Sequence, residues 1–260
     1  MKVDFLNLIR LRTSLSKMSW PTSQRRWRGC CPVVIGGCAR SGTTLLLSVL
    51  SSHPRICAIP FETQALCPTA YWPEPRRNAT LDAEIIRNHL LSTAVPPDCR
   101  YWCEKTPKNV LFFGQILRHF GRTARLIHMV RDGRDVVCSI HPDDPTRCWV
   151  SPPRWVKDVA AGLAFEQHRQ VLTVRYEDLV SRFHATIHGV CEFLELDMTY
   201  HLEEYPAHAT VKTSNAWFDP ARVPTPSSVG KWRTESCRER VDELMANADA
   251  VKLLHHFNYL

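Results

Sequence analysis

The chain has 260 residues, of which 44% are hydrophobic, 23% charged and 9% aromatic, with ten glycines. This composition excludes disordered, collagen-like and repeat-biased proteins, and the length predicts one domain or two. No stretch of the sequence reaches the roughly 18 to 20 uninterrupted apolar residues that a membrane-spanning helix needs. We therefore expect a soluble, cytoplasmic protein with a hydrophobic core and no transmembrane segment.

The formal net charge of +7 is concentrated at the N-terminus. Residues 1–29 carry seven basic side chains and one acid, so that a net charge of only +1 is left for residues 30–260. A nearly neutral body has no broad attraction for a phosphate backbone, and we expect no nucleic-acid partner. Residues 1–29 are predicted to be a basic extension, either poorly ordered or used for targeting such as organelle import, and residues 30–260 one domain.

The eleven cysteines predict reduced thiols. Their number is odd, none forms a C-x-x-C pair, and several lie inside apolar runs, so the pattern favours neither a zinc site nor a fully paired disulfide framework. Buried free thiols are typical of proteins from a reducing compartment.

Three segments of the chain have the pattern of a strand, a loop and a helix. The predicted pairs are strand 33–35 with helix 43–51, strand 124–130 with helix 135–140, and strand 171–175 with helix 181–194. Strands that alternate with helices indicate a parallel sheet covered on both faces, so we expect a single P-loop-like α/β domain. Ligands of such sheets bind at the carboxyl ends of the strands.

The first of these loops has the pattern of an anion-binding loop. Residues 37–44 fit G-x-x-x-x-G-x-T, in which glycines let backbone N–H groups surround an anion at a helix N-terminus. Thr43 stands where nucleoside-triphosphate-binding loops carry a lysine, and Arg40 supplies a cation three positions earlier. The alternative is an ordinary strand-to-helix turn without a ligand.

Four motifs in order resemble the sulfotransferases that use 3′-phosphoadenosine 5′-phosphosulfate (PAPS), over about residues 32 to 240. They are Arg40-Ser41-Gly42-Thr43-Thr44, the run from Arg131 to Ser139, Arg175-Tyr176-Glu177-Asp178-Leu179, and the run from Ser227 to Trp232. The resemblance implies that the first loop holds the 5′-phosphosulfate and that Arg131 and Ser139 hold the 3′-phosphate. It also implies that Tyr176 approaches the adenine and that Lys231 lies in a late loop over the nucleotide.

The resemblance also implies the catalytic residues. With its arginine, the first loop resembles that of the tyrosylprotein sulfotransferases and their bacterial-type relatives. The catalytic glutamate and lysine of that subgroup correspond to Glu62 and Lys105. In sulfuryl transfer, negative charge grows on the leaving nucleotide and the acceptor loses a proton, so cations and a base are required. Arg40 and Lys105 can stabilise the transition state, and Glu62 can act as general base.

The acceptor is less defined than the donor. Gln64 stands where tyrosylprotein sulfotransferases keep a peptide-binding arginine, and we expect no Golgi-type membrane anchor. With the near-neutral body, this favours a small-molecule hydroxyl or amine over peptide tyrosine. The variable loops 64–102 and 142–160 are expected to set this choice, and a homodimer is compatible with the sequence.

Several alternatives stay open at this point. By fold the chain could be a P-loop kinase or NTPase, although the loop lysine and an evident Mg²⁺-binding acid are missing, or a nucleotide-binding relative without catalysis. His128 or His141 could replace Glu62 as the base. His184 and His188 have i, i+4 spacing but no third ligand, so we expect no metal.

Overall fold

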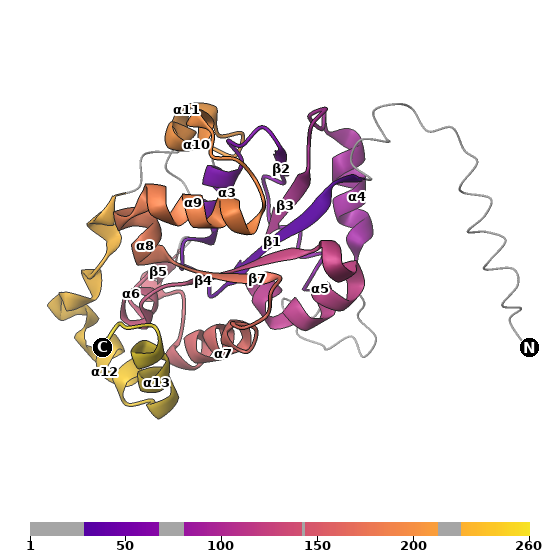
Figure 1. Ribbon diagram of the computed structural model, residues 1–260. Coiled ribbons are helices and arrows are strands. Elements are labelled where there is room, and N and C mark those ends of the chain that lie inside the picture. Colours follow the sequence, from indigo (N-terminus) through magenta and orange to yellow (C-terminus); the bar gives the residue numbers. More distant parts are fainter. Residues whose placement is uncertain (1–28, 68–80, 142–143, 213–224) are drawn as a thin grey trace, which may run out of the picture.

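The computed structural model describes residues 29–67, 81–141, 144–212 and 225–260, so the basic extension expected over residues 1–29 lies almost wholly outside the described part. The described chain forms one sheet of five parallel strands with helices on both sides (Figure 1). The strand order is β2 (Ile56–Ala58), β3 (Tyr101–Lys105), β1 (Cys31–Gly37), β4 (Arg125–Val130) and β7 (Val171–Arg175). This confirms the predicted parallel α/β sheet.

The central strand β1 shows why this sequence forms a buried sheet. Its residues point alternately to the two faces, as a strand requires. Val33 and Ile35 belong to one hydrophobic cluster and Val34 to another, and all three are fully buried. β1 pairs with β3 on one side and β4 on the other, so the chain after β1 emerges at the point where the strand order reverses.

Helices cover both faces of the sheet (Figure 1). One face packs against α3 (Thr43–Leu50), α9 (Phe183–Phe193), α10 (Tyr200–Glu203) and α11 (Tyr205–His208). The other packs against α4 (Ala83–Ser92), the 3₁₀ helix η3 (Pro107–Phe112) and α5 (Phe113–Phe120). A third cluster joins α6 (Gly133–Val137), α7 (Pro152–Leu163), α12 (Arg238–Met245) and α13 (Ala248–His256) beside the carboxyl ends of β1 and β4.

Short elements complete the described chain. They are η4 (Gly121–Thr123), a two-stranded ribbon of β5 (Ile140–His141) and β6 (Asp144–Cys148), α8 (Tyr176–Ser181), η5 (Pro226–Ser228), η6 (Lys231–Arg233) and η7 (Glu235–Cys237). The helix predicted over 135–140 was wrong at its end, because α6 stops at Val137 and Ile140 pairs with Cys148 in the ribbon. The helix predicted over 181–194 corresponds to most of α9, which follows the separate α8.

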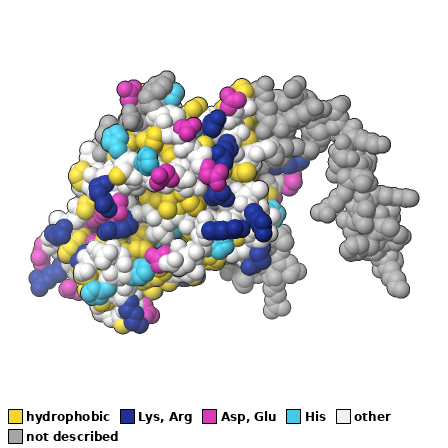
Figure 2. All heavy atoms as spheres, in the orientation of Figure 1, with side chains coloured by type: hydrophobic (Ala, Val, Ile, Leu, Met, Phe, Trp, Pro, Cys, Tyr) yellow, Lys and Arg dark blue, Asp and Glu magenta, His cyan; other side chains and the backbone are white. Residues whose placement is uncertain are grey.

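Surface charges are mixed on the face of the molecule shown in Figure 2, where acidic and basic side chains lie interspersed over the described residues. This distribution agrees with the near-neutral body expected from the sequence.

His128 on β4 makes the fold sensitive to acid. Its ring is fully buried, neither ring nitrogen has a hydrogen-bond partner among the described residues, and Gly162 packs so closely that a Cβ there would lie 2.3 Å from the ring. Burial lowers the pKa of His128 from 6.5 to about 3. The unfolded chain therefore binds this proton at a higher pH than the folded protein, and stability falls as the pH drops from 6.5 toward 3.

We expect His128 to lower the free energy of unfolding by about 2 kcal/mol when the pH falls from neutral to 5. His128→Met removes the titrating group and fills a similar volume. Urea unfolding of both proteins at pH 7.5 and pH 5 measures the difference, which should shrink in the variant. An identical acid dependence in the two proteins would rule out His128 as its source.

Candidate functional site

The loop that follows β1 has the backbone geometry of an anion cradle. Gly42 and Arg40 have φ angles of +86° and +69°, and Ser41 N–H donates to the carbonyl oxygen of Cys38 at 3.2 Å. α3 begins at Thr43 without a side-chain cap, so N–H groups of its first turn remain available to a ligand. Thr43 is buried and Thr44 half-buried.

Two buried polar atoms next to this loop have no hydrogen-bond partner among the described residues. They are Ser41 Oγ, on a side chain without solvent exposure, and Arg131 Nε. Leaving such a group unpaired costs about 1–3 kcal/mol, so native structures normally supply it with a partner. Phosphate or sulfate oxygens of one ligand would serve these atoms. The residues present therefore fit the phosphorylated nucleotide that the sequence predicts.

Arg131 joins three of the predicted motifs. Its Nη1 donates to the carbonyl oxygen of Arg40 at 3.0 Å, and its Nη2 donates to that of Ser228 at 2.5 Å. The guanidinium carbon lies 4.4 Å from the centre of the Tyr176 ring. One segment 91 residues before Arg131 and another 97 residues after it thus meet around this side chain.

Positive charge converges at the same place. Burial lowers the pKa of Arg40 below its ordinary value, and the charge of Arg131 acts in the same direction. Two neighbouring guanidinium groups repel each other, and a bound anion relieves that repulsion. The pair is therefore suited to a ligand that carries several negative charges.

The late loop, residues 225–237, is held against α6 by Asp135. One carboxylate oxygen accepts the N–H of Gly230 at 2.8 Å and the other accepts that of Trp232 at 3.0 Å. Lys231 lies between these two residues with an exposed side chain. Asp135 was not among the predicted site residues, yet it fixes the position of the loop that carries Lys231.

Removing this carboxylate should release the late loop. We expect Asp135→Ala to weaken binding of 3′-phosphoadenosine 5′-phosphate (PAP) about tenfold, because the loop loses two charge-assisted hydrogen bonds of about 1.5–3 kcal/mol each, partly replaced by water. Calorimetry measures the affinity, and proteolysis of residues 225–237 reports the opening. Asp249→Ala on α13 is the matched control. Unchanged proteolysis in Asp135→Ala would contradict the assigned role.

The two predicted catalytic residues, Glu62 and Lys105, form an ion pair although they lie 43 positions apart in the chain. Lys105 Nζ donates to Glu62 Oε1 at 2.6 Å. The Lys105 side chain is 1% exposed and that of Glu62 26%, so the carboxylate faces partly toward solvent. Lys105 ends β3 opposite Ile35 of β1, which places the pair at the same edge of the sheet as the anion loop.

A buried carboxylate behind this pair was missed by the sequence analysis. Glu104 accepts hydrogen bonds from the Oγ1 of Thr63 at 2.9 Å, from Thr106 Oγ1 at 2.6 Å and from Asn109 Nδ2 at 2.6 Å. Burial raises the pKa of Glu104, although these donors oppose the shift. The network fixes the residue next to Glu62 and thereby positions the ion pair.

A second network supports the nucleotide side. Glu177 accepts the N–H of Asp132 at 3.0 Å and the hydroxyl of Tyr259 at 2.7 Å, while the carbonyl oxygen of Tyr259 accepts from Arg134 at 2.6 Å. This network stabilises the turn after β4. Ser139 is half-buried and its hydroxyl donates to the carbonyl oxygen of Asp135 at 2.9 Å, one turn earlier in the chain.

The histidine alternatives gain no support from the geometry. His128 is buried inside the sheet, and the rings of His141 and Trp149 meet edge to face with their centres 3.9 Å apart. Across residues 29–67, 81–141, 144–212 and 225–260, no group of three or more metal-ligating side chains is arranged to hold an ion. Within the same ranges, no helix combines the length and apolarity needed to cross a membrane.

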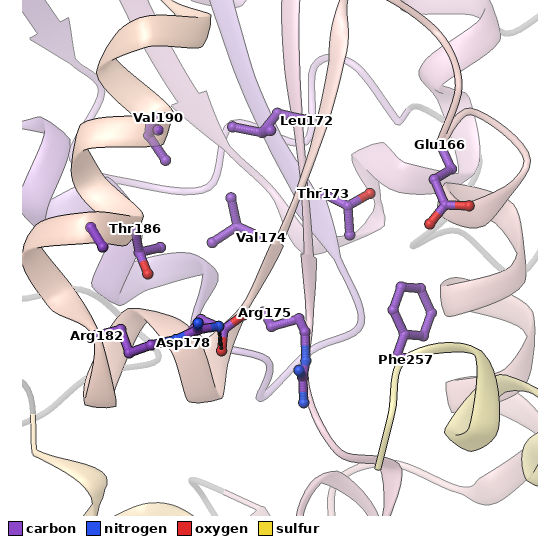
Figure 3. Close-up of a pocket in the computed structure, with 12 residues that line it drawn as sticks. Glu166, Leu172, Thr173, Val174, Arg175, Asp178, Arg182, Thr186, Val190 and Phe257 are labelled. Atoms are coloured by element: carbon purple, nitrogen blue, oxygen red, sulfur yellow. Dashed lines mark hydrogen bonds and ion pairs between the residues drawn. The ribbon is translucent and has the colours of Figure 1, made fainter. Parts of the chain in front are cut away.

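A groove of about 450 Å³ runs along β7, between α8 and α9 on one side and Phe257 on the other (Figure 3). Leu172 and Val174 point toward α9, and Thr173 and Arg175 point the opposite way. Arg175 and Asp178 of the third motif line this groove, but none of the residues predicted to bind the nucleotide or to act in catalysis does. It is therefore separate from the candidate site.

Comparisons with known proteins agree with this arrangement. No curated protein sequence matches the chain, whereas solved structures with the same fold do. The sulfotransferase domain of the Synechococcus olefin synthase is 20% identical, with a TM-score of 0.59 over 88% of this chain and 94% of that one. A sulfotransferase from Alicyclobacillus acidocaldarius is 15% identical, with a TM-score of 0.51 over 87% and 95%.

Mouse sulfotransferase SULT7A1, solved in complex with PAP, is 15% identical, with a TM-score of 0.52 over 90% of each chain. A sequence profile described as the sulfotransferase family matches residues 32–200, which include the anion loop, the Glu62–Lys105 pair, Arg131 and Tyr176. The chain therefore belongs to the sulfotransferase family.

Proposed function

We propose that this protein transfers the sulfuryl group of PAPS to a hydroxyl or amine of an acceptor and releases PAP. One observation carries the proposal: Arg131 ties the anion loop to the late loop through the carbonyl oxygens of Arg40 and Ser228, and the buried hydroxyl of Ser41 in that anion loop has no partner among the described residues. The PAP complex of the mouse relative supports the same nucleotide.

We assign the binding of the sulfuryl donor PAPS to residues of four segments. The backbone of the anion loop and the side chains of Arg40, Ser41, Thr43 and Thr44 would hold the 5′-phosphosulfate. Arg131 and Ser139 would hold the 3′-phosphate, with the Ser139 hydroxyl turning from its present backbone partner. Tyr176, already packed on Gly42, would contact the adenine, and Lys231 would cover the nucleotide from the late loop.

The chemistry follows from the ion pair. PAPS supplies an activated sulfuryl group whose bond to the phosphate oxygen breaks as the acceptor oxygen or nitrogen attacks. Arg40 and Lys105 stabilise the charge that develops on that phosphate oxygen. Glu62 takes the proton of the acceptor, and its partial exposure lets an acceptor reach it. Lys105 holds Glu62 in a fixed orientation until the acceptor arrives.

Calorimetry tests the nucleotide assignment first. PAP is titrated without metal into the wild-type protein, into Arg131→Ala and into Arg87→Ala, a control arginine on α4. ATP with magnesium is titrated in parallel. We expect PAP to bind the wild type and the control alike and Arg131→Ala at least tenfold more weakly.

The alternatives give different results. A kinase-like protein would bind ATP with magnesium and not PAP, which would overturn the proposal. A binding protein without catalysis would bind PAP but give no labelled product from ³⁵S-PAPS with any acceptor, whether Glu62 and Lys105 were present or not. Transfer that depends on both residues supports the enzyme.

For the acceptor, we propose a small molecule rather than a peptide tyrosine, because Gln64 replaces the arginine that would hold an acidic peptide. Phenols, alcohols, amines and acidic tyrosine peptides are compared as acceptors of ³⁵S label. A kcat/KM for the peptides above that of every small molecule would contradict this choice.

A further inference from the structure

Three thiols gather where the late loop meets the end of α6. Cys138 follows α6, Cys237 ends η7, and Cys148 lies on β6. Cys138 Sγ donates to the carbonyl oxygen of Cys237 at 3.8 Å. Cys148 pairs across the ribbon with Ile140, two residues after Cys138.

The sulfur of Cys237 lies in polar, half-buried surroundings. Thr234 Oγ1 donates to Cys237 Sγ at 3.3 Å, and the sulfur lies 3.8 Å from the carbonyl oxygen of Lys231. Cys138, Cys148 and Cys237 are all half-buried, in contrast to the buried Cys38, Cys57, Cys67, Cys103 and Cys191. A soluble oxidant can therefore reach this group before it reaches the core thiols.

Noncovalent contacts already hold the first part of the late loop. Arg131 donates a hydrogen bond to Ser228, and Asp135 accepts hydrogen bonds from Gly230 and Trp232. The segment after Trp232 approaches the end of α6 through Cys237. A bond between Cys138 and Cys237 would fix this far end. It would close a loop of 99 residues, which strongly restricts the unfolded chain.

We propose that Cys138 and Cys237 form a reversible disulfide that locks the late loop onto α6. With hydrogen peroxide as oxidant, the two thiols lose two hydrogen atoms, an S–S bond forms and the peroxide is reduced to two molecules of water. A dithiol reverses the step by thiol–disulfide exchange. In its effect on the nucleotide this lock rests on the proposed function, because a fixed late loop slows entry and release of PAP.

Oxidation of the full-length protein with hydrogen peroxide, in the presence of PAP, tests the lock. Peptide mass spectrometry under non-reducing conditions should find the Cys138–Cys237 link, and dithiothreitol should remove it. The oxidised protein should melt roughly 5 to 15 °C higher. The amides of Gly230 and Trp232 should exchange hydrogen at least tenfold more slowly, and PAP should dissociate at least tenfold more slowly.

Cys237→Ser and Cys138→Ser should abolish these changes, and Cys148→Ser, the matched control, should retain them. Serine at 237 can still accept the hydrogen bond from Thr234. A link from either thiol to Cys148 in place of the 138–237 pair, or unchanged amide exchange in the linked protein, would overturn the proposal. Failure of PAP to bind the reduced protein would refute the proposed function. The disulfide proposal would still be tested by the mass-spectrometric link and by the amide exchange.

Discussion

Replacing Lys105 by methionine should lower the rate of sulfuryl transfer about 100- to 1000-fold, the usual cost of removing a preorganised group that stabilises transition-state charge. Methionine keeps the length and most of the apolar stem of this buried side chain. PAP affinity should change by less than about threefold, because the lost interaction develops mainly as the sulfuryl group leaves. Single-turnover kinetics with ³⁵S-PAPS and calorimetry with PAP measure the two quantities.

Lys157→Met provides the control, since Lys157 is exposed on α7 and lies outside the Glu62–Lys105 pair. It should transfer at the wild-type rate. A Lys105→Met protein that is folded, binds PAP and transfers within threefold of wild type would show that Lys105 neither stabilises the transition state nor orients Glu62 for catalysis.

The second large effect is expected for Gly42→Ala. Gly42 has a φ of +86°, where alanine is strained by about 1 kcal/mol. The added Cβ would lie 2.5 Å from Cδ2 of Tyr176, so the ring must move. Tyr176 also lies against Arg131, and its displacement disturbs both the anion loop and the arginine. We expect Gly42→Ala to bind PAP at least 100-fold more weakly and to have a free energy of unfolding about 2–4 kcal/mol lower than wild type.

Gly189→Ala on α9 is the matched control, because a Cβ at this position meets nothing within 4 Å. Alanine there should leave PAP affinity unchanged and raise stability by up to about 1 kcal/mol, as expected for a helical position. Denaturant unfolding and calorimetry compare the two variants. Equal PAP affinities would refute the close fit of Tyr176 on the loop.

The strands were predictable where their sequences are apolar and β-branched. β1, β4 and β7 have this pattern and were found. β3 was not, because its last two residues, Glu104 and Lys105, are charged and suggest a polar motif rather than a buried strand. β2 is only three residues long, which is too short for a periodic pattern.

The site shows the same division. Glycine and arginine spacing along one loop is local information, so the anion cradle was predicted from that loop alone, and the role of Arg131 was predicted from the resemblance of its motif to the family. Asp135 and Glu104 act on residues 95 and 41 positions away, and a single sequence does not contain those pairings. For Glu104 a signal existed, since an acid directly after the apolar run Tyr101-Trp102-Cys103 must be buried with partners or turned outward.

Because Tyr259 lies late in the chain, its contacts with Arg134 and Glu177 form late during synthesis of the protein. A ribosome releases the sheet strands and the anion loop long before residue 259 leaves the exit tunnel. The turn after β4 gains its last supports only at that moment. A nascent or truncated chain that stops before Tyr259 would thus have a complete sheet but lack these two supports of the turn after β4.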